Sequence, residues 1–155
     1  MTCFSADIKS WFERTTPLKS FESATSVDIQ RTEKSIDGSL PRALKSVLAE
    51  VNGGIWLMEK ELLSAEKISD MVSSVQSSSL WKDYFVPFAG DESGLLVLNR
   101  DGEVCEWDPE DGLSDSISPS LSSYLEHFRD QLLEGHCEFL RDVGVIEKVT
   151  GKSRK

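Results

Sequence analysis

The sequence has no apolar run of the length that crosses a membrane, and it is poor in cysteine, histidine and basic residues. Membrane-spanning helices need about 20 consecutive apolar residues, so we expect none here. The three cysteines, Cys3, Cys105 and Cys137, lack the spacing of a disulfide framework, which favours a reducing compartment. The first residues, MTCFSADIKSWF, lack the pattern of a signal peptide. We therefore expect a cytoplasmic protein, or a cytoskeletal or nucleocytoplasmic one.

Basic residues are outnumbered: 17 Lys and Arg face 27 Asp and Glu, which gives a formal net charge of −10. Phosphate backbones repel such a surface, so neither nucleic acid nor a membrane is an expected partner. The one basic cluster is the segment 148–155. An acidic surface suits a basic protein partner, because complementary charge speeds association. The alternative interpretation is that the charge only keeps the protein soluble.

Catalytic motifs are missing as well. Residues 90–94, GDESG, have their serine one position away from that of the nucleophile elbow G-x-S-x-G. Residues 151–153, GKS, lack the earlier glycine and the following helix of a phosphate-binding loop. The adjacent pair His136-Cys137 does not have zinc-ligand spacing. We therefore expect no catalytic residue, no cofactor and no enzyme activity.

The 155 residues suffice for one domain with a core that needs neither disulfide nor metal. We divide the chain into an N-terminal helical lead-in at 1–24, a single domain at 25–149 and a flexible basic tail at 150–155. Such a chain would be a monomer or one subunit of a larger assembly.

The clearest structural signal is a β-hairpin within residues 84–111. An apolar run at 95–98 is followed by Asn-Arg-Asp-Gly at 99–102, and residues 103–107 then return. Apolar periodicity and turn residues elsewhere predict helices at 6–13, 25–36, 41–51, 63–75 and 121–134, and strands at 55–58, 84–88, 94–98, 103–108 and 137–140. The fold class is therefore α+β: a mixed, mostly antiparallel bent sheet with N-terminal, central and C-terminal helices.

Helix ends can be predicted from a few polar residues. Thr25 and Asp28 resemble a capping box, and Ser39 is placed to cap the helix that starts near Pro41. Asn52-Gly53-Gly54 is typical of a helix end, because Asn and Gly accept a left-handed conformation. Gly135 is likewise a natural C-terminal cap for the helix at 121–134. Asn52 is also a candidate binding residue, since polar loop residues are often functional.

The densest acidic set of the chain surrounds the hairpin and supplies most of the candidate binding residues: Asp91, Glu92, Glu106, Asp108 and Glu110. The simplest interpretation is a solvated acidic rim. In a second interpretation Asp91, Glu106 and Asp108 hold a divalent ion in a small metal-dependent enzyme.

Three tryptophans, Trp56, Trp81 and Trp107, have two possible roles. They can belong to the core, or they can line one sheet face as a partner groove, because Trp is enriched at binding hot spots. Trp56 and Trp107 are therefore further binding candidates, with Trp107 at the surface or rim.

Several of these motifs, taken in order, resemble the cell-wall-assembly-regulator family, the SUKH superfamily. The resembling residues are Leu40-Pro41, Asn52-Gly53-Gly54, Pro87-Phe88-Ala89, Asp91, Gly94, Gly102, Val104, Trp107-Asp108 and the helix around Ser120–Phe128. The resemblance covers roughly residues 25 to 135 and implies a bent sheet with helices packed along it. It departs from the family in the acidic loop, which keeps only Gly90 and Gly94 of a more glycine-rich pattern.

The resemblance also implies a kind of function. The family includes regulators of cell-wall assembly and signalling, subunits of larger complexes, and bacterial immunity proteins that neutralise toxins. We therefore expect a non-catalytic protein-binding module, a regulatory or scaffold subunit whose acidic sheet and loop surface recognises a protein partner. A toxin-neutralising immunity protein and the small metal-dependent enzyme are the alternatives.

Overall fold

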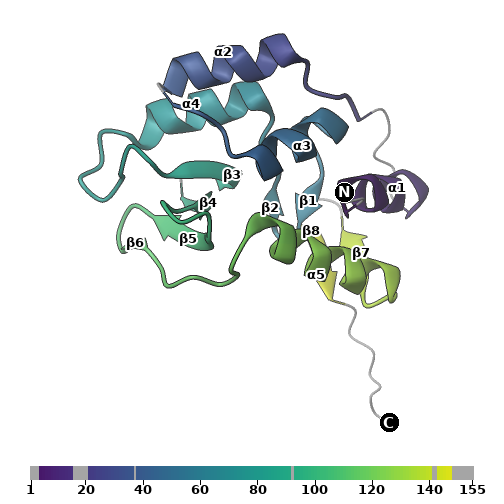
Figure 1. Cartoon of the computed structure of the whole chain (residues 1–155). Coiled ribbons are helices and arrows are strands. Elements are labelled where there is room, and N and C mark those ends of the chain that lie inside the picture. The colour runs from purple at the N-terminus through teal and green to yellow at the C-terminus, as the bar shows by residue number, and fades with distance from the viewer. Residues whose placement is uncertain (1–3, 16–20, 37, 92, 141–142, 148–155) are drawn as a thin grey trace.

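The structure, a computed structural model, describes residues 4–15, 21–36, 38–91, 93–140 and 143–147. The helices are α1 (Phe4–Thr15), α2 (Ser26–Ile36), α3 (Arg42–Glu50), α4 (Ala65–Val75) and α5 (Leu121–Leu133). The strands are β1 (Trp56–Leu57), β2 (Lys60–Glu61), β3 (Val86–Asp91), β4 (Gly94–Leu98), β5 (Val104–Asp108), β6 (Gly112–Leu113), β7 (Cys137–Leu140) and β8 (Gly144–Glu147). The α+β class predicted from the sequence is confirmed (Figure 1). Helices α1 to α3 precede the strands, α4 lies between β2 and β3, and α5 is followed by the last two strands, β7 and β8. The predicted tail at 150–155 lies outside the described residues.

The strands are divided among three antiparallel sheets rather than joined in one mixed sheet. The central sheet has the order β3-β4-β5-β6, and β1-β2 and β7-β8 are separate hairpins. Short backbone contacts connect the three. Leu63 N donates to Phe88 O at 2.8 Å beside an isolated antiparallel bridge between Leu62 and Ala89, and Val145 N donates to Met58 O at 2.8 Å. The segments predicted at 55–58 and 137–140 therefore flank the central sheet without extending its ladder.

The predicted central hairpin is confirmed. Leu95 pairs with Trp107 and Leu98 pairs with Val104 across β4 and β5. In the turn, Gly102 has φ +82° and its N–H donates to Asn99 O at 3.0 Å. A glycine accepts this left-handed conformation at least cost, which explains its place at the end of the turn.

Both faces of the central sheet are buried, each in a different apolar cluster. Successive side chains of a strand point to opposite faces. Leu96 and Leu98 of β4 accordingly join the larger cluster, whereas Leu95 and Val97 join the smaller one with Trp81. The larger cluster also takes residues from α1, α3 and α5, and the smaller one is packed against Met71 and Val72 of α4.

The helices lie on opposite sides of the strands. In Figure 1, α2 and α4 run side by side at the top of the molecule, above β3, and α5 lies below with β7 and β8. Helix α1 packs against α5, and its Ile8, Trp11 and Phe12 are buried in the larger cluster. The N-terminal helix thus shares one core with the rest of the chain.

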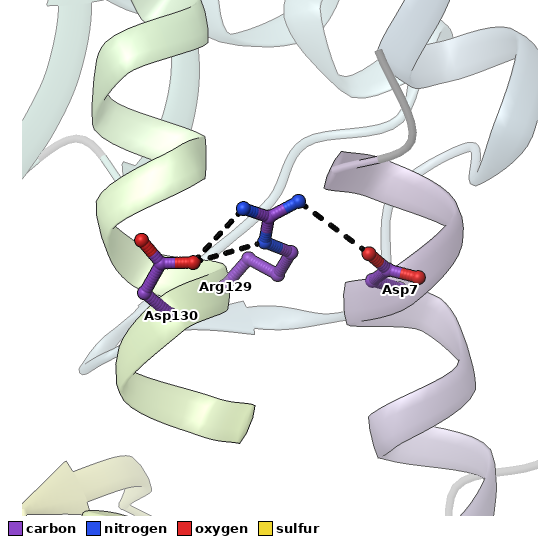
Figure 2. A network of polar contacts seen from close by, with 3 residues as sticks. All are labelled: Asp7, Arg129 and Asp130. Carbon is purple, nitrogen blue, oxygen red and sulfur yellow. Dashed lines mark hydrogen bonds and ion pairs between the residues drawn. The ribbon is translucent and has the colours of Figure 1, made fainter. Parts of the chain in front are cut away.

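An arginine on α5 joins α1 to α5 at the surface of that contact. Figure 2 shows the Arg129 guanidinium between two carboxylates. Its Nε and Nη2 donate to Asp130 Oδ1 at 3.1 and 2.9 Å, and its Nη1 lies 3.6 Å from Asp7 Oδ2 of α1. The hydrogen bond to Asp130 is the main cause that raises the pKa of Arg129. The cation orients α1 on α5, while the apolar residues supply most of the attraction.

Two of the predicted helix caps are present. Thr25 and Asp28 form a reciprocal pair, with Asp28 N donating to Thr25 Oγ1 and Thr25 N to Asp28 Oδ2. The left-handed glycine after α5 is Gly135, at φ +80°. The prediction of a Ser39 cap on α3 is wrong, because Pro41 occupies the N-cap position and no side chain caps it.

A glutamate of α2 holds the turn into α3 instead. Glu33 Oε2 accepts a hydrogen bond from Leu40 N at 2.7 Å and lies 3.4 Å from Lys45 Nζ. Leu40 is only 2 % exposed, so an unpaired N–H at this position would be costly. This bond explains why a carboxylate stands seven residues before the Leu-Pro motif.

Candidate functional site

A groove of about 500 Å³ opens where the three sheets meet. Two of its sides come from the β1–β2 turn, residues 57–60, and from β8, residues 145–147. The remaining lining residues are Leu96, Glu106, Ile117 and Tyr124. We call this hollow the groove. It brings together segments that are far apart in the sequence, and no short motif marks it.

The two sides are held together by an unusual turn. Met58 has φ +59°, a conformation that non-glycine residues rarely adopt, and its carbonyl oxygen accepts the hydrogen bond from Val145 N. At Gly144, which has φ +114°, a Cβ atom would lie 2.5 Å from Met58 O and 2.7 Å from Trp56 Cε3. Only a glycine fits at position 144, and its small size lets β8 approach the β1–β2 turn closely enough to form the groove.

The charge around the groove is mainly negative. Glu59, Glu106 and Glu147 line it, and among the described residues none of their carboxylates has an ion pair or a hydrogen bond. Within the described part of the chain the one lining cation is Lys60, whose Nζ donates to Gly94 O at 3.4 Å. The Lys60 ammonium is therefore engaged toward β4, which leaves the three glutamates to set the charge of the groove.

Tyr124 of α5 adds a neutral hydroxyl to this acidic setting. Burial, with a smaller contribution from the nearby Glu106 charge, raises the pKa of Tyr124 to about 12. The phenol therefore stays protonated at any physiological pH and can donate a hydrogen bond. Its ring also packs edge-on against Phe88, with centroids 6.2 Å apart.

The other predicted acidic residues do not join Glu106 in one cluster. Asp91 Oδ1 accepts hydrogen bonds from Ser93 N at 3.0 Å and Ser93 Oγ at 2.6 Å. The hydroxyl bond is the first cause that lowers the pKa of Asp91. Asp108 Oδ1 accepts from the N–H groups of Glu110 and Asp111 at 2.8 and 2.7 Å. Both aspartates shape their own loops.

The metal-site hypothesis finds no support in this arrangement. Within the part of the chain that the structure describes, no three His, Cys, Asp or Glu side chains lie close enough together to hold a metal ion. Glu110 is exposed, and Glu92 lies outside the described residues. Of the predicted trio, Asp91 and Asp108 each accept hydrogen bonds within their own loop, whereas Glu106 lines the groove.

Trp107 is a core residue, so the prediction that it lies at the surface or rim is wrong. It is 2 % exposed, its ring packs edge-on against Trp81 at 5.3 Å, and its Nε1 donates to Leu80 O at 3.1 Å. The reason is strand alternation: Trp107 points to the smaller cluster, opposite to Glu106.

Trp56 lies apart from the other two tryptophans, in the β1–β2 hairpin, so the three do not line one sheet face. Its ring is half-buried beside Gly144. It also lines a smaller hollow next to the groove, together with Lys60 and Asp91. Of the two predicted aromatic candidates, Trp56 is the one that keeps some exposed surface.

Asn52 has a structural role across the fold. Its Oδ1 accepts a hydrogen bond from Ala65 N at 2.8 Å, at the first residue of α4. Its own N–H donates to Glu22 O at 2.6 Å. Gly53 and Gly54 follow with φ +83° and +89°. The C-cap of α3 is Val51 in an extended conformation, so the prediction of a left-handed helix end at Asn52-Gly53-Gly54 is wrong. Asn52 thus connects the end of α3 to the start of α4.

Sequence reasoning missed Glu59, Ile117, Tyr124 and Glu147. Tyr124 shares the apolar stripe of the helix predicted at 121–134, which indicates a core residue, and the other three belong to no motif. One usable signal was the hairpin register, because pairing of Leu96 with Glu106 places a charge on a face that is otherwise apolar. The opposite side of the groove could not be inferred without the position of β8.

Comparison with known proteins bears on the family of the chain. None of the helices in the described residues has the length and apolar character needed to span a bilayer. A search of curated proteins gave no significant match. The sequence matches the family model of the SMI1 / KNR4 family (SUKH-1) over residues 23–127, about two-thirds of the chain. The resemblance inferred from the motifs is confirmed, and the chain belongs to the SMI1 / KNR4 family (SUKH-1).

Proposed function

We propose that this chain is a non-catalytic protein-binding module that recognises a basic protein partner through the groove. The observation that carries the proposal is the set of three glutamate side chains, Glu59, Glu106 and Glu147, that surround the groove without a cation of their own among the described residues. Carboxylates in this state are available to an incoming Lys or Arg.

The composition of the groove also fits a protein surface. Protein interfaces combine an apolar centre with a polar rim. Here Leu57, Leu96 and Val145 are buried apolar lining residues, and Ile117 is 50 % exposed. The acidic net charge of −10 would steer a basic partner toward the chain before contact.

Two kinds of binding protein are compatible with this family. A regulatory or scaffold subunit would be present stably in a larger assembly. A toxin-neutralising immunity protein would instead hold one basic toxin in a one-to-one complex. The acidic charge favours a basic partner in both cases, and the stoichiometry of the captured complex distinguishes them.

The test is affinity purification of the tagged full chain from its own cells, at low and moderate salt, followed by mass spectrometry. The groove variant carries Glu59→Gln, Glu106→Gln and Glu147→Gln. Its matched control carries Glu13→Gln, Glu22→Gln and Glu66→Gln, which are exposed glutamates outside the groove. Both variants change the net charge by the same amount.

We expect a basic partner that is retained by the wild-type chain and the control but lost by the groove variant and at higher salt. Equal loss from both variants would show that general charge, rather than the groove, attracts the partner. A salt-resistant partner retained by the groove variant would move the binding surface elsewhere on the molecule.

A further inference from the structure

Glu147, one of the residues that line the groove, directly precedes the most basic segment of the chain. The last described residue of β8 is Glu147, which lines the groove. Residues 148–155, KVTGKSRK, follow it immediately and lie outside the described residues. They contain four Lys and Arg residues and no acidic residue, whereas the groove is lined by three glutamates. An acidic hollow and a basic segment are thus adjacent in one chain.

Length and tethering both favour contact between them. An extended segment of eight residues reaches roughly 27 Å, so the segment can return across the groove from its attachment at Glu147. A short tether holds a segment at an effective concentration on the order of millimolar. Even a weak electrostatic contact is then substantially occupied.

We propose that residues 148–155 occupy the groove of their own chain and compete there with the basic partner. This proposal rests on the function proposed above, because it assigns a regulator to the same site. Cations of the segment would pair with Glu59 and Glu106, which have no ion pair among the described residues. A partner must then displace the segment, so the chain binds only partners that are more basic or more apolar than its own tail.

The first test is zero-length crosslinking of the full chain with a carbodiimide, which joins an amine to a carboxylate only in contact. We expect products between Lys152 or Lys155 and Glu106 or Glu59, in the monomeric species at low protein concentration. Their yield should fall at about 1 M salt, where the Debye length is about 3 Å. Products that are mainly between chains, or that join the tail equally to Glu13 and Glu66, would overturn the proposal.

The second test measures the affinity of a labelled synthetic peptide with the sequence of residues 148–155. The tail variant carries Lys148→Gln, Lys152→Gln, Arg154→Gln and Lys155→Gln in the full chain. Its control removes four exposed cations elsewhere, by Lys34→Gln, Arg42→Gln, Lys67→Gln and Lys82→Gln, and has the same net charge. We expect the peptide to bind the tail variant several-fold more tightly than the control.

The outcomes separate this proposal from the function on which it rests. Equal affinity of the peptide for the tail variant and the control would overturn docking of the tail, and the acidic groove would remain as a site. Absence of binding to every chain would overturn both the docking and the electrostatic use of the groove. Glu106→Gln in the tail variant should weaken the peptide affinity, which locates the contact.

Discussion

The two faces of strand β5 have different roles, and its adjacent residues Glu106 and Trp107 show the contrast. Trp107 is closed in by Trp81, Phe85 and α4, whereas Glu106 opens into the groove. The two residues are adjacent in the sequence, yet only the first belongs to the core. The difference teaches that candidate residues on a strand must be separated by face before they are grouped into a site.

The same strand also separates two kinds of carboxylate. Glu106 has no hydrogen bond to its carboxylate among the described residues, while Asp108 accepts two from the backbone of its own turn. Both point to the face opposite Trp107, because they are two residues apart. A shared face therefore does not give a shared role.

The largest effect on stability should come from the buried face of β5, which carries Trp107. Trp107→Ala removes a buried ring and leaves a cavity, so we expect the free energy of unfolding to fall by about 3–5 kcal/mol. Urea denaturation measures this loss, with Trp107→Phe as the milder comparison. A loss below about 1 kcal/mol would mean that the ring is not part of the core.

On the groove side, Tyr124 should make the stability of the protein depend on pH. The pKa of Tyr124 is about 12 in the folded chain and about 10 in the unfolded one. Between these values the unfolded state binds fewer protons, so stability falls as the pH rises from 10 to 12, by on the order of 2 kcal/mol.

Tyr124→Phe removes this titration, and the free energy of unfolding of the variant should then depend less on pH across that window. Denaturation at several pH values compares the two slopes, which are insensitive to the constant effect of losing the hydroxyl. Identical slopes would show that the phenol is not shielded from water.

A smaller loss of stability is expected for Asp108, whose carboxylate caps its own turn. Asp108→Ala removes the acceptor of two backbone hydrogen bonds in an exposed turn, and we expect about 1 kcal/mol of destabilisation. Binding of a basic peptide should not change. If Asp108→Ala weakened peptide binding as Glu106→Gln does, the distinction between loop and groove carboxylates would be lost.

The smallest effect on stability should be that of Glu106→Gln. Its carboxylate makes no contact that folding requires, so the free energy of unfolding should stay within about 0.5 kcal/mol. The same change should weaken binding of a basic peptide and lower the salt dependence of that binding. Calorimetry at two salt concentrations, beside thermal denaturation, measures both.

Much of the local structure followed from short-range rules. The hairpin at 95–107, the Thr25–Asp28 capping box and the Gly135 helix end depend on neighbouring residues, and each was predicted correctly. The family could be inferred too, because its motifs are also local. The α+β class followed from the order of apolar periods along the chain.

The site was harder to predict, because its parts are distant in the sequence. Among the predicted candidates that the structure describes, only Glu106 lines the groove, and Trp107, Asp108 and Asn52 are engaged in packing or in backbone contacts. Acidic residues look alike in a sequence whether they cap a turn or stand free. Their hydrogen-bond partners are known only once the loops are placed.

The sequence by itself determined the helices and the central hairpin, the acidic charge and the family, because these depend on residue types within a few positions of one another. The tertiary structure decided which glutamates face a common hollow, because that requires β8 to reach the β1–β2 turn. That approach depends on Gly144, whose missing side chain leaves room for Met58 O and the Trp56 ring. The contact between Met58 and Val145, which are 87 positions apart, gives no local signal, and it is this contact that forms the groove.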